Sequence, residues 1–140
     1  MTNNATHPQK YQGGCHCGAV RFEVELDLSN GASMCNCTIC TKVSQVGTVV
    51  KPAAFALLQG EDNLGSYEFG TKVGQRKFCK TCGVHCFGPG FLEFLGGAYV
   101  SINLNALDDF DRGKIAIKYW DGRHNNWQSG LRETPWPVVA

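Results

Sequence analysis

The sequence predicts an all-β domain built from short antiparallel strands. The strongest observation is the alternation in residues 20–27, where every second residue is apolar and every intervening one is charged, as in a half-buried strand. The 17 glycines, many of which separate short apolar runs, are typical of a turn-rich sheet. No segment keeps the i, i+3, i+4, i+7 spacing of an amphipathic helix over about ten residues or more.

Further short strands are expected along the chain, each a run rich in β-branched and aromatic residues between glycines or polar turn residues. They lie at residues 46–50, 55–58, 66–69, 75–78, 98–104 and 115–120. Gly88, Pro89 and Gly90 are expected to separate two strands, and single helical turns are expected near residues 40–45 and 106–109. The cysteines then fall at turns between strands.

The length and composition predict one domain. At 140 residues the chain is long enough to bury a core and short enough for a metal to contribute much of the stability. The polar opening predicts a flexible N-terminal tail at residues 1–10, followed by a single domain over residues 11–140. No internal repeat and no Pro- or Ser-rich linker divides it.

Charge and hydropathy exclude several classes of partner. The formal net charge of +1 provides no broad basic surface for nucleic acid or anionic membranes. The opening residues lack the apolar run of a secretory signal, and no run of about 18 apolar residues predicts a membrane span. We therefore expect a cytoplasmic protein, in whose reducing compartment the cysteines are metal ligands or core residues rather than disulfides. The oligomeric state is not predicted.

Seven of the eight cysteines fall into three close groups with the spacing of metal ligands. A Cys-x-Cys or Cys-x-x-Cys segment brings two sulfurs onto one cation, and zinc takes four thiolates in a structural site or three plus an exchangeable ligand in a catalytic one. Seven thiolates divide into four and three. The groups are Cys15 and Cys17; Cys35, Cys37 and Cys40; and Cys79 and Cys82.

The first and last groups are expected to form one closed, structural zinc site. Gly18 and Gly83 directly follow them, and a residue without Cβ lets the backbone turn around a metal. Joining these two groups closes a loop of about sixty residues, which only a folded chain holds in register. The site therefore acts as a clamp between distant segments.

The middle group is expected to form the second zinc site, which is catalytic. Cys35, Cys37 and Cys40 can reach one metal from a single local turn, which leaves one coordination position open. Two alternatives remain open. The thiolates could hold an iron–sulfur cluster, or His85, Cys86 or His16 could complete a second closed zinc site.

Residues 14–22, 35–40 and 77–83 together resemble the glutathione-dependent formaldehyde-activating enzyme family, which includes a centromere-associated (centromere protein V) branch. The resemblance covers about residues 11 to 127. It implies an Mss4-like zinc-supported β fold, with the first and last cysteine groups on a structural metal and the middle group on a catalytic one. It also implies a carbon–sulfur lyase that joins a thiol such as glutathione to a small aldehyde such as formaldehyde. The alternative is a non-catalytic zinc-stabilised β module that binds a protein partner.

Other polar and aromatic residues are further candidates for the site. Cys86 is expected in the core and His85 is the better candidate for a proton carrier. Thiol substrates with carboxylates need cationic side chains nearby, and four candidates are available: Lys42, Arg76, Lys77 and Arg123. The tryptophans at 120, 127 and 136 are expected to cap the core rather than to line the site.

Overall fold

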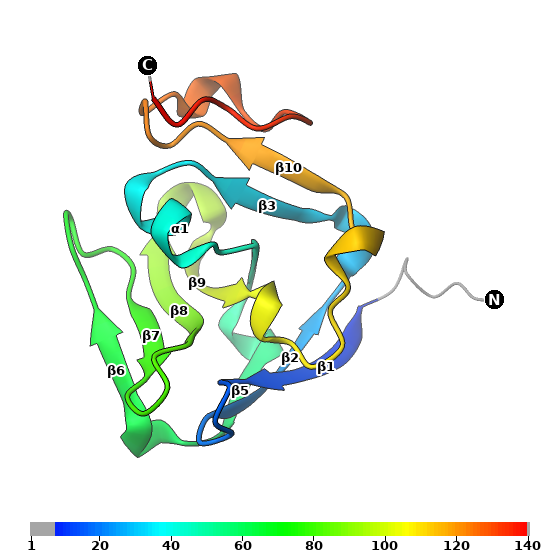
Figure 1. Cartoon of the computed structure of the whole chain (residues 1–140), viewed down its shortest axis with the longest axis vertical. Coiled ribbons are helices and arrows are strands. Elements are labelled where there is room, and N and C mark those ends of the chain that lie inside the picture. The colour runs from blue at the N-terminus through cyan, green and yellow to red at the C-terminus, as the bar shows by residue number, and fades with distance from the viewer. Residues whose placement is uncertain (1–7, 140) are drawn as a thin grey trace.

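Two β-sheets make up most of the protein, whose computed structural model describes residues 8–139. The smaller sheet has the strand order β1-β2-β5, with β1 at Gln9–Gly14, β2 at Arg21–Leu26 and β5 at Phe55–Gln59. All of its strand pairs are antiparallel. The larger sheet has the order β10-β3-β4-β9-β8-β7-β6 (Figure 1).

The larger sheet is mostly antiparallel and contains the short helix α1 in one of its connections. Its one departure is β10, which pairs parallel with β3 and places Trp120 opposite Cys35. The expectation of purely antiparallel strands was wrong at this pair, because β3 and β10 lie far apart in the sequence and need no hairpin. The elements are β3 (Ala32–Cys35), α1 (Thr38–Val43), β4 (Gly47–Val50), β6 (Leu64–Tyr67), β7 (Arg76–Cys79), β8 (His85–Leu92), β9 (Gly97–Asn103) and β10 (Ile117–Trp120).

Short 3-10 turns complete the connections. They lie at Leu28–Asn30, Pro52–Ala54, Glu61–Asn63, Glu93–Leu95, Leu104–Ala106, Arg112–Lys114 and Trp127–Ser129. The mostly β architecture confirms the predicted fold class. No helix in residues 8–139 has the length and apolar character needed to cross a membrane.

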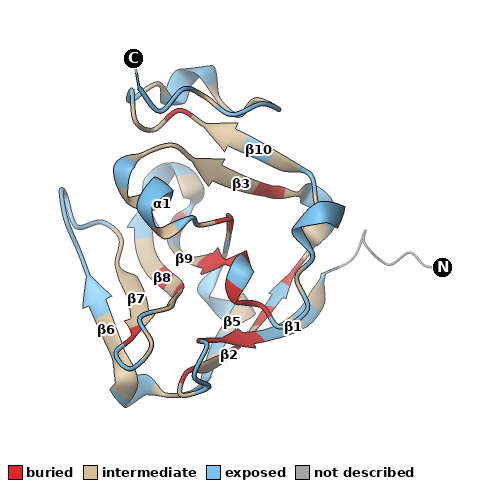
Figure 2. Ribbon diagram, viewed as in Figure 1, coloured by how far each residue is buried: buried red, intermediate tan, exposed pale blue. Residues whose placement is uncertain are grey.

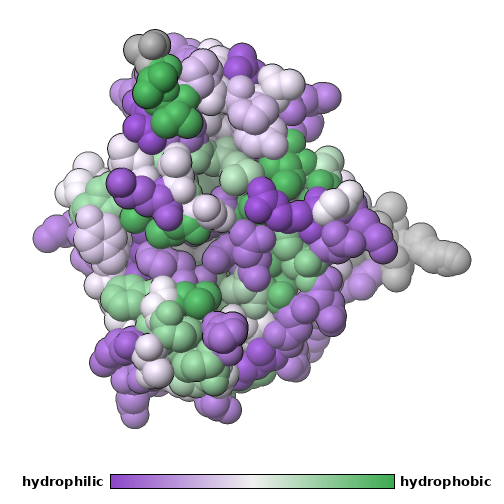
Figure 3. All heavy atoms as spheres, in the orientation of Figure 1, coloured by the Kyte–Doolittle hydropathy of each residue, from purple (hydrophilic) through white to green (hydrophobic). Residues whose placement is uncertain are grey.

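The core lies where the two sheets face each other. On β2 the residues Phe22, Val24 and Leu26 are buried, and the charged residues between them point outward, as the alternation predicted. Phe22, Phe55 and Phe87 pack together with ring centroids 4.5 to 6.1 Å apart and thus join the small sheet to β8. Figure 2 shows the buried residues gathered along β2, β8 and β9. In Figure 3 hydrophilic residues cover much of the surface at the lower right, where β1 lies in Figure 1.

The N-terminal boundary differs from the expected one. β1 begins at Gln9, two positions inside the expected tail of residues 1–10, because its backbone pairs with β2 from Gln9 opposite Leu26 onward. This strand has too few apolar residues to produce a sequence pattern. Residues 1–7 lie outside the described part of the chain, so the tail remains a prediction for them.

The segment Gly88-Pro89-Gly90 was expected to separate two strands and instead lies inside β8, so this expectation was wrong. All three residues pair with β9. The two glycines serve close packing: a Cβ on Gly88 would lie 2.0 Å from the backbone oxygen of Gln75, and one on Gly90 would lie 2.3 Å from the Tyr99 hydroxyl. Glycine here marks a close approach between strands rather than a turn.

Gly88→Ala is predicted to lower the free energy of unfolding by about 2 kcal/mol or more, because the added methyl meets backbone that cannot move away cheaply. Denaturant unfolding followed by far-UV circular dichroism measures the change. The matched control is Gly113→Ala, where the new Cβ would contact only the Asp111 side chain at 3.3 Å. Equal stability of the two variants would contradict the assigned packing.

Candidate metal centres

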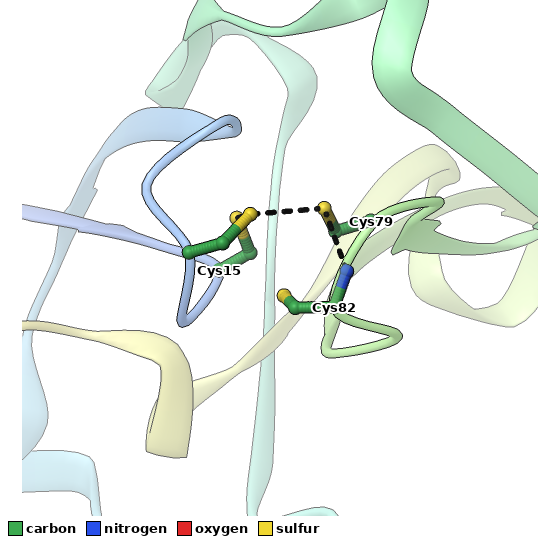
Figure 4. A group of neighbouring side chains, drawn as sticks. Cys15, Cys79 and Cys82 are labelled. Atoms are coloured by element: carbon green, nitrogen blue, oxygen red, sulfur yellow. Dashed lines mark hydrogen bonds between the residues drawn. The ribbon is translucent and has the colours of Figure 1, made fainter.

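The four-cysteine cluster of Cys15, Cys17, Cys79 and Cys82 joins the two sheets. Cys15 and Cys17 lie in the turn between β1 and β2, and the other two lie where β7 turns into β8. Their four sulfurs lie within 4.8 Å of one another. Figure 4 shows Cys15 facing Cys79 and Cys82 from the opposite turn. The predicted pairing of the first and last groups is thus present in the structure.

Both turns have the backbone geometry that the sequence predicted. Gly18 has φ of 87° and Gly83 has φ of 79°, a region that favours glycine, and a Cβ added at either glycine would have no atom within 4 Å. Conformation rather than space therefore selects glycine at both sites. The amides of Thr81 and Cys82 donate to the Cys79 sulfur at 3.4 and 3.5 Å, and the Val20 amide donates to Cys15 at 3.2 Å.

The amide donors to the Cys79 sulfur favour the thiolate form that a metal requires. The amide of Cys82, followed by that of Thr81, lowers the pKa of Cys79 to about 6. Asn63 adds a donor from outside the turn, with its side-chain nitrogen 3.2 Å from the Cys79 sulfur and 3.0 Å from the Thr81 hydroxyl. The sequence reasoning did not find Asn63, because no local spacing connects it to the cysteines.

The sulfur spacing of this cluster fits zinc. The Cys15–Cys17 and Cys17–Cys79 sulfur pairs are each 3.6 Å apart. Four thiolates at about 2.3 Å from a tetrahedral zinc ion would be about 3.8 Å from one another. All eight cysteines are free thiols, of which seven lie in the two clusters and Cys86 lies in the core.

The three-cysteine cluster of Cys35, Cys37 and Cys40 forms locally, as predicted. Cys35 ends β3, Cys37 is the N-cap residue of α1, and Cys40 lies inside that helix. The amide of Thr41 donates to the Cys37 carbonyl at 2.9 Å, which holds the first turn of the helix. The three sulfurs lie within 4.8 Å of one another and could hold a metal ion.

The thiols of the three-cysteine cluster differ in pKa. Hydrogen bonds from Cys35 and then Cys40 lower the pKa of Cys37 to about 2. Contact with Cys37 raises the pKa of Cys35, and contacts with both partners raise that of Cys40. Negative charge is therefore concentrated on the Cys37 sulfur, which suits a site for a cation.

Arg76 is the cationic side chain that contacts this cluster. One guanidinium nitrogen lies 3.4 Å from the Cys40 sulfur and the other lies 3.4 Å from the Gln45 side-chain oxygen. Of the four cationic candidates, Arg123 also lies beside the cluster, where its Nε donates to the Asn36 carbonyl at 2.8 Å. Lys42 is exposed on α1.

A buried carboxylate holds the cysteine loop from the other side. Asp121 is only 4% exposed and accepts hydrogen bonds from the side chains of Asn36 at 2.7 Å, His124 at 2.7 Å and Asn126 at 3.2 Å. Burial alone would raise the pKa of Asp121, but these three partners lower it. Asn36 lies between two ligands, so this network fixes the loop. No local spacing in the sequence connects Asp121 to the cysteines, so the network was not predicted.

A cleft of about 900 Å³ opens beside the three-cysteine cluster, with Cys35 and Cys40 in its wall. Trp120 and Trp127 also line it, with ring centroids 5.8 Å apart. The expectation that these two tryptophans cap the core was wrong, because β10 places Trp120 opposite Cys35 and the later 3-10 turn places Trp127 against Trp120. Trp136 does cap β10, donating to the Tyr119 carbonyl at 2.9 Å.

The candidate fourth ligands do not join the cluster. Within residues 8–139, no histidine, aspartate, glutamate or further cysteine places a ligand atom in it. Cys86 is fully buried in the core, as expected, and burial raises its pKa to about 12. His16 is exposed in the β1–β2 turn. His85 stacks on Phe78 at 5.7 Å and lines a neighbouring hollow of about 460 Å³ together with Arg76.

Comparison with known proteins agrees with this geometry. Residues 10–123 match the family model described as glutathione-dependent formaldehyde-activating enzyme. A Halomonas elongata protein whose name assigns it provisionally to this enzyme is 32% identical over 79 residues, which is 51% of the chain and 50% of that protein. The match therefore spans about half the length of this curated relative. A crystal structure of a Rhodobacter sphaeroides protein is similar with a TM-score of 0.63 and 28% identity, covering 90% of this chain and 99% of that one.

The two clusters predict about two zinc ions per chain after purification without added metal. Elemental analysis by mass spectrometry provides the count. The three-cysteine cluster is expected to lose its ion first during dialysis against a chelator, because three ligands bind less tightly than four. Iron with visible charge-transfer absorption would instead support the iron–sulfur alternative.

Cys79→Ser is predicted to prevent stable folding, because a structural zinc contributes on the order of 10 kcal/mol to folding in small zinc modules. Cys37→Ser is the matched variant in the other cluster and is expected to stay folded. Thermal unfolding by circular dichroism compares the two. An equal loss of melting temperature would contradict the division into a structural and a functional metal.

Proposed function

The chain belongs to the glutathione-dependent formaldehyde-activating enzyme family, and from this premise we propose that it is a cytoplasmic, zinc-dependent carbon–sulfur lyase. It forms or cleaves adducts between a low-molecular-weight thiol, glutathione or a similar one, and a small aldehyde such as formaldehyde. The reaction is an addition without net oxidation: the sulfur bonds to the carbonyl carbon, the thiol loses its proton, and the carbonyl oxygen gains one. The product is a hemithioacetal.

One observation carries the proposal. The three-cysteine cluster lies in the wall of a cleft, whereas the four-cysteine cluster lies between two turns. A ligand set of three beside a cavity fits a site that accepts substrate, and a ligand set of four fits a structural site. We therefore assign Cys35, Cys37 and Cys40 to the catalytic zinc and the other four to the structural one.

A zinc ion with three thiolates and one exchangeable position supplies thiolate stabilisation or carbonyl polarisation at neutral pH. The chain contributes the charge balance around that site. Three thiolates carry more negative charge than the ion offsets, and the guanidinium of Arg76, 3.4 Å from the Cys40 sulfur, reduces the excess. An anionic thiolate substrate is then less strongly repelled.

His85 is proposed as the proton acceptor. Burial and then the charge of Arg76 lower the pKa of its imidazole, so the ring is neutral at pH 7 and has a lone pair for the thiol proton. His85 lines the hollow next to the cleft, and the two share Gln45 and Ser101. The alternative function, a zinc-stabilised module that binds a protein partner, needs neither the proton acceptor nor the cleft.

The zinc-loaded protein is predicted to accelerate formation of S-hydroxymethylglutathione from formaldehyde and glutathione. Exchange NMR is the suitable measurement, since the uncatalysed reaction is already appreciable. Cys37→Ser is expected to reduce the rate to background, because it removes a ligand from the cluster in the cleft. Chelation should abolish the acceleration and added zinc should restore it.

The matched control is Cys86→Ala, which removes a cysteine from the core and not from either cluster, and which should keep the acceleration. If neither glutathione nor another thiol reacts faster with the wild-type protein while both metals are bound, the enzyme proposal is wrong. The protein-binding module is then the better description.

A further inference from the structure

The cleft beside the three-cysteine cluster is predominantly apolar. Its apolar side chains include Val49 of β4, Phe94 and Leu95 of the connection between β8 and β9, and Trp127 and Leu131 of the C-terminal segment. Several of these side chains are exposed to the open cleft, including Phe94 at 82% and Trp127 at 49%. Apolar surface of this kind gains free energy when a ligand removes it from water.

Charged groups are scarce in the same walls. Among the described residues that line the cleft, only Lys118 carries a charge. Arg76 lies in the neighbouring hollow, where its two terminal nitrogens already contact Cys40 and Gln45. Glutathione has two carboxylates and an ammonium group, so this lining offers a cationic partner for one carboxylate and no acidic partner for the ammonium.

The aromatic wall begins directly at the cluster. A Cβ on Gly122 would lie 2.5 Å from the Cys35 sulfur and 2.7 Å from the Trp127 ring, so the glycine allows sulfur and ring to approach the same point. The Trp127 indole nitrogen donates to the Asn125 side-chain oxygen at 2.9 Å, which fixes the ring plane. A group attached to a sulfur held at the cluster would therefore meet an aromatic face within its first few atoms.

We propose that the thiol preferred at this cleft carries an aromatic or branched apolar group and at most one carboxylate, and that glutathione is accepted less well. Its sulfur lies toward Cys35 and Cys40, its apolar group packs against Trp120 and Trp127, and a carboxylate, where present, pairs with Lys118. This inference rests on the proposed function and specifies its substrate class.

The test compares three thiols at a fixed formaldehyde concentration: phenylmethanethiol, 2-mercaptoethanol and glutathione. For each thiol, the rate of adduct formation with zinc-loaded protein is divided by its uncatalysed rate. This ratio should be at least about tenfold larger for phenylmethanethiol than for 2-mercaptoethanol, because burial of the phenyl group strengthens binding. Trp127→Ala should make the ratios of these two thiols nearly equal. The control Trp136→Ala, outside the cleft lining, should preserve the difference.

A binding measurement separates this inference from the proposed function. Phenylmethanethiol without formaldehyde should quench tryptophan fluorescence of the zinc-loaded protein, with an affinity about tenfold weaker in Trp127→Ala. Leu131→Ala provides a second variant should Trp127→Ala not fold, with a smaller loss expected. If phenylmethanethiol quenches the fluorescence strongly but no thiol forms its adduct faster, the enzyme proposal is wrong and the inference about the cleft is unaffected. A larger acceleration for glutathione or 2-mercaptoethanol, unchanged in Trp127→Ala, would overturn the inference.

Discussion

The contact on which the rest of the structure depends is the meeting of four sulfurs between two turns. Cys17 and Cys79 are separated by 62 positions in sequence, yet their sulfurs are 3.6 Å apart. Each sheet has its own hydrogen bonds, and near β8 the phenylalanine contacts and this cluster join the small sheet to the larger one. A small core alone stabilises such a junction weakly, and a metal bound by these four sulfurs would supply what the apolar contacts lack.

The three-cysteine cluster is held by different means, and the difference matters for its chemistry. Its loop is positioned by the parallel pairing of β3 with β10 and by the buried Asp121, which binds Asn36 between two of the cysteines. These supports come from the protein itself. Loss of the metal there would leave the loop attached, which is the property expected of a site with an exchangeable position.

Local periodicity was enough to predict β2, because its burial alternates along the chain, but it missed β8, in which Gly88-Pro89-Gly90 was expected to be a turn. It could not find β1 or β3, whose sequences are polar or mixed and whose order comes from pairing with neighbours. Spacing predicted which cysteines meet. It could not predict Asn63 or Asp121, because these side chains reach the cysteine segments across large sequence separations. Arg76 was one of four cationic candidates, and spacing could not single it out as the one that contacts Cys40.

The residues of the three-cysteine cluster and the aromatic residues of the cleft come from different parts of the chain. The ligands Cys35, Cys37 and Cys40 come from one short segment, while the aromatic wall comes from β10 and the residues after it. Gly122 is where the two meet, since it lies against both the Cys35 sulfur and the Trp127 ring. Substitutions in the C-terminal segment can therefore reshape the cleft without removing a ligand. In the proposed enzyme, the segment that would contact the substrate therefore differs from the segment that would hold the metal.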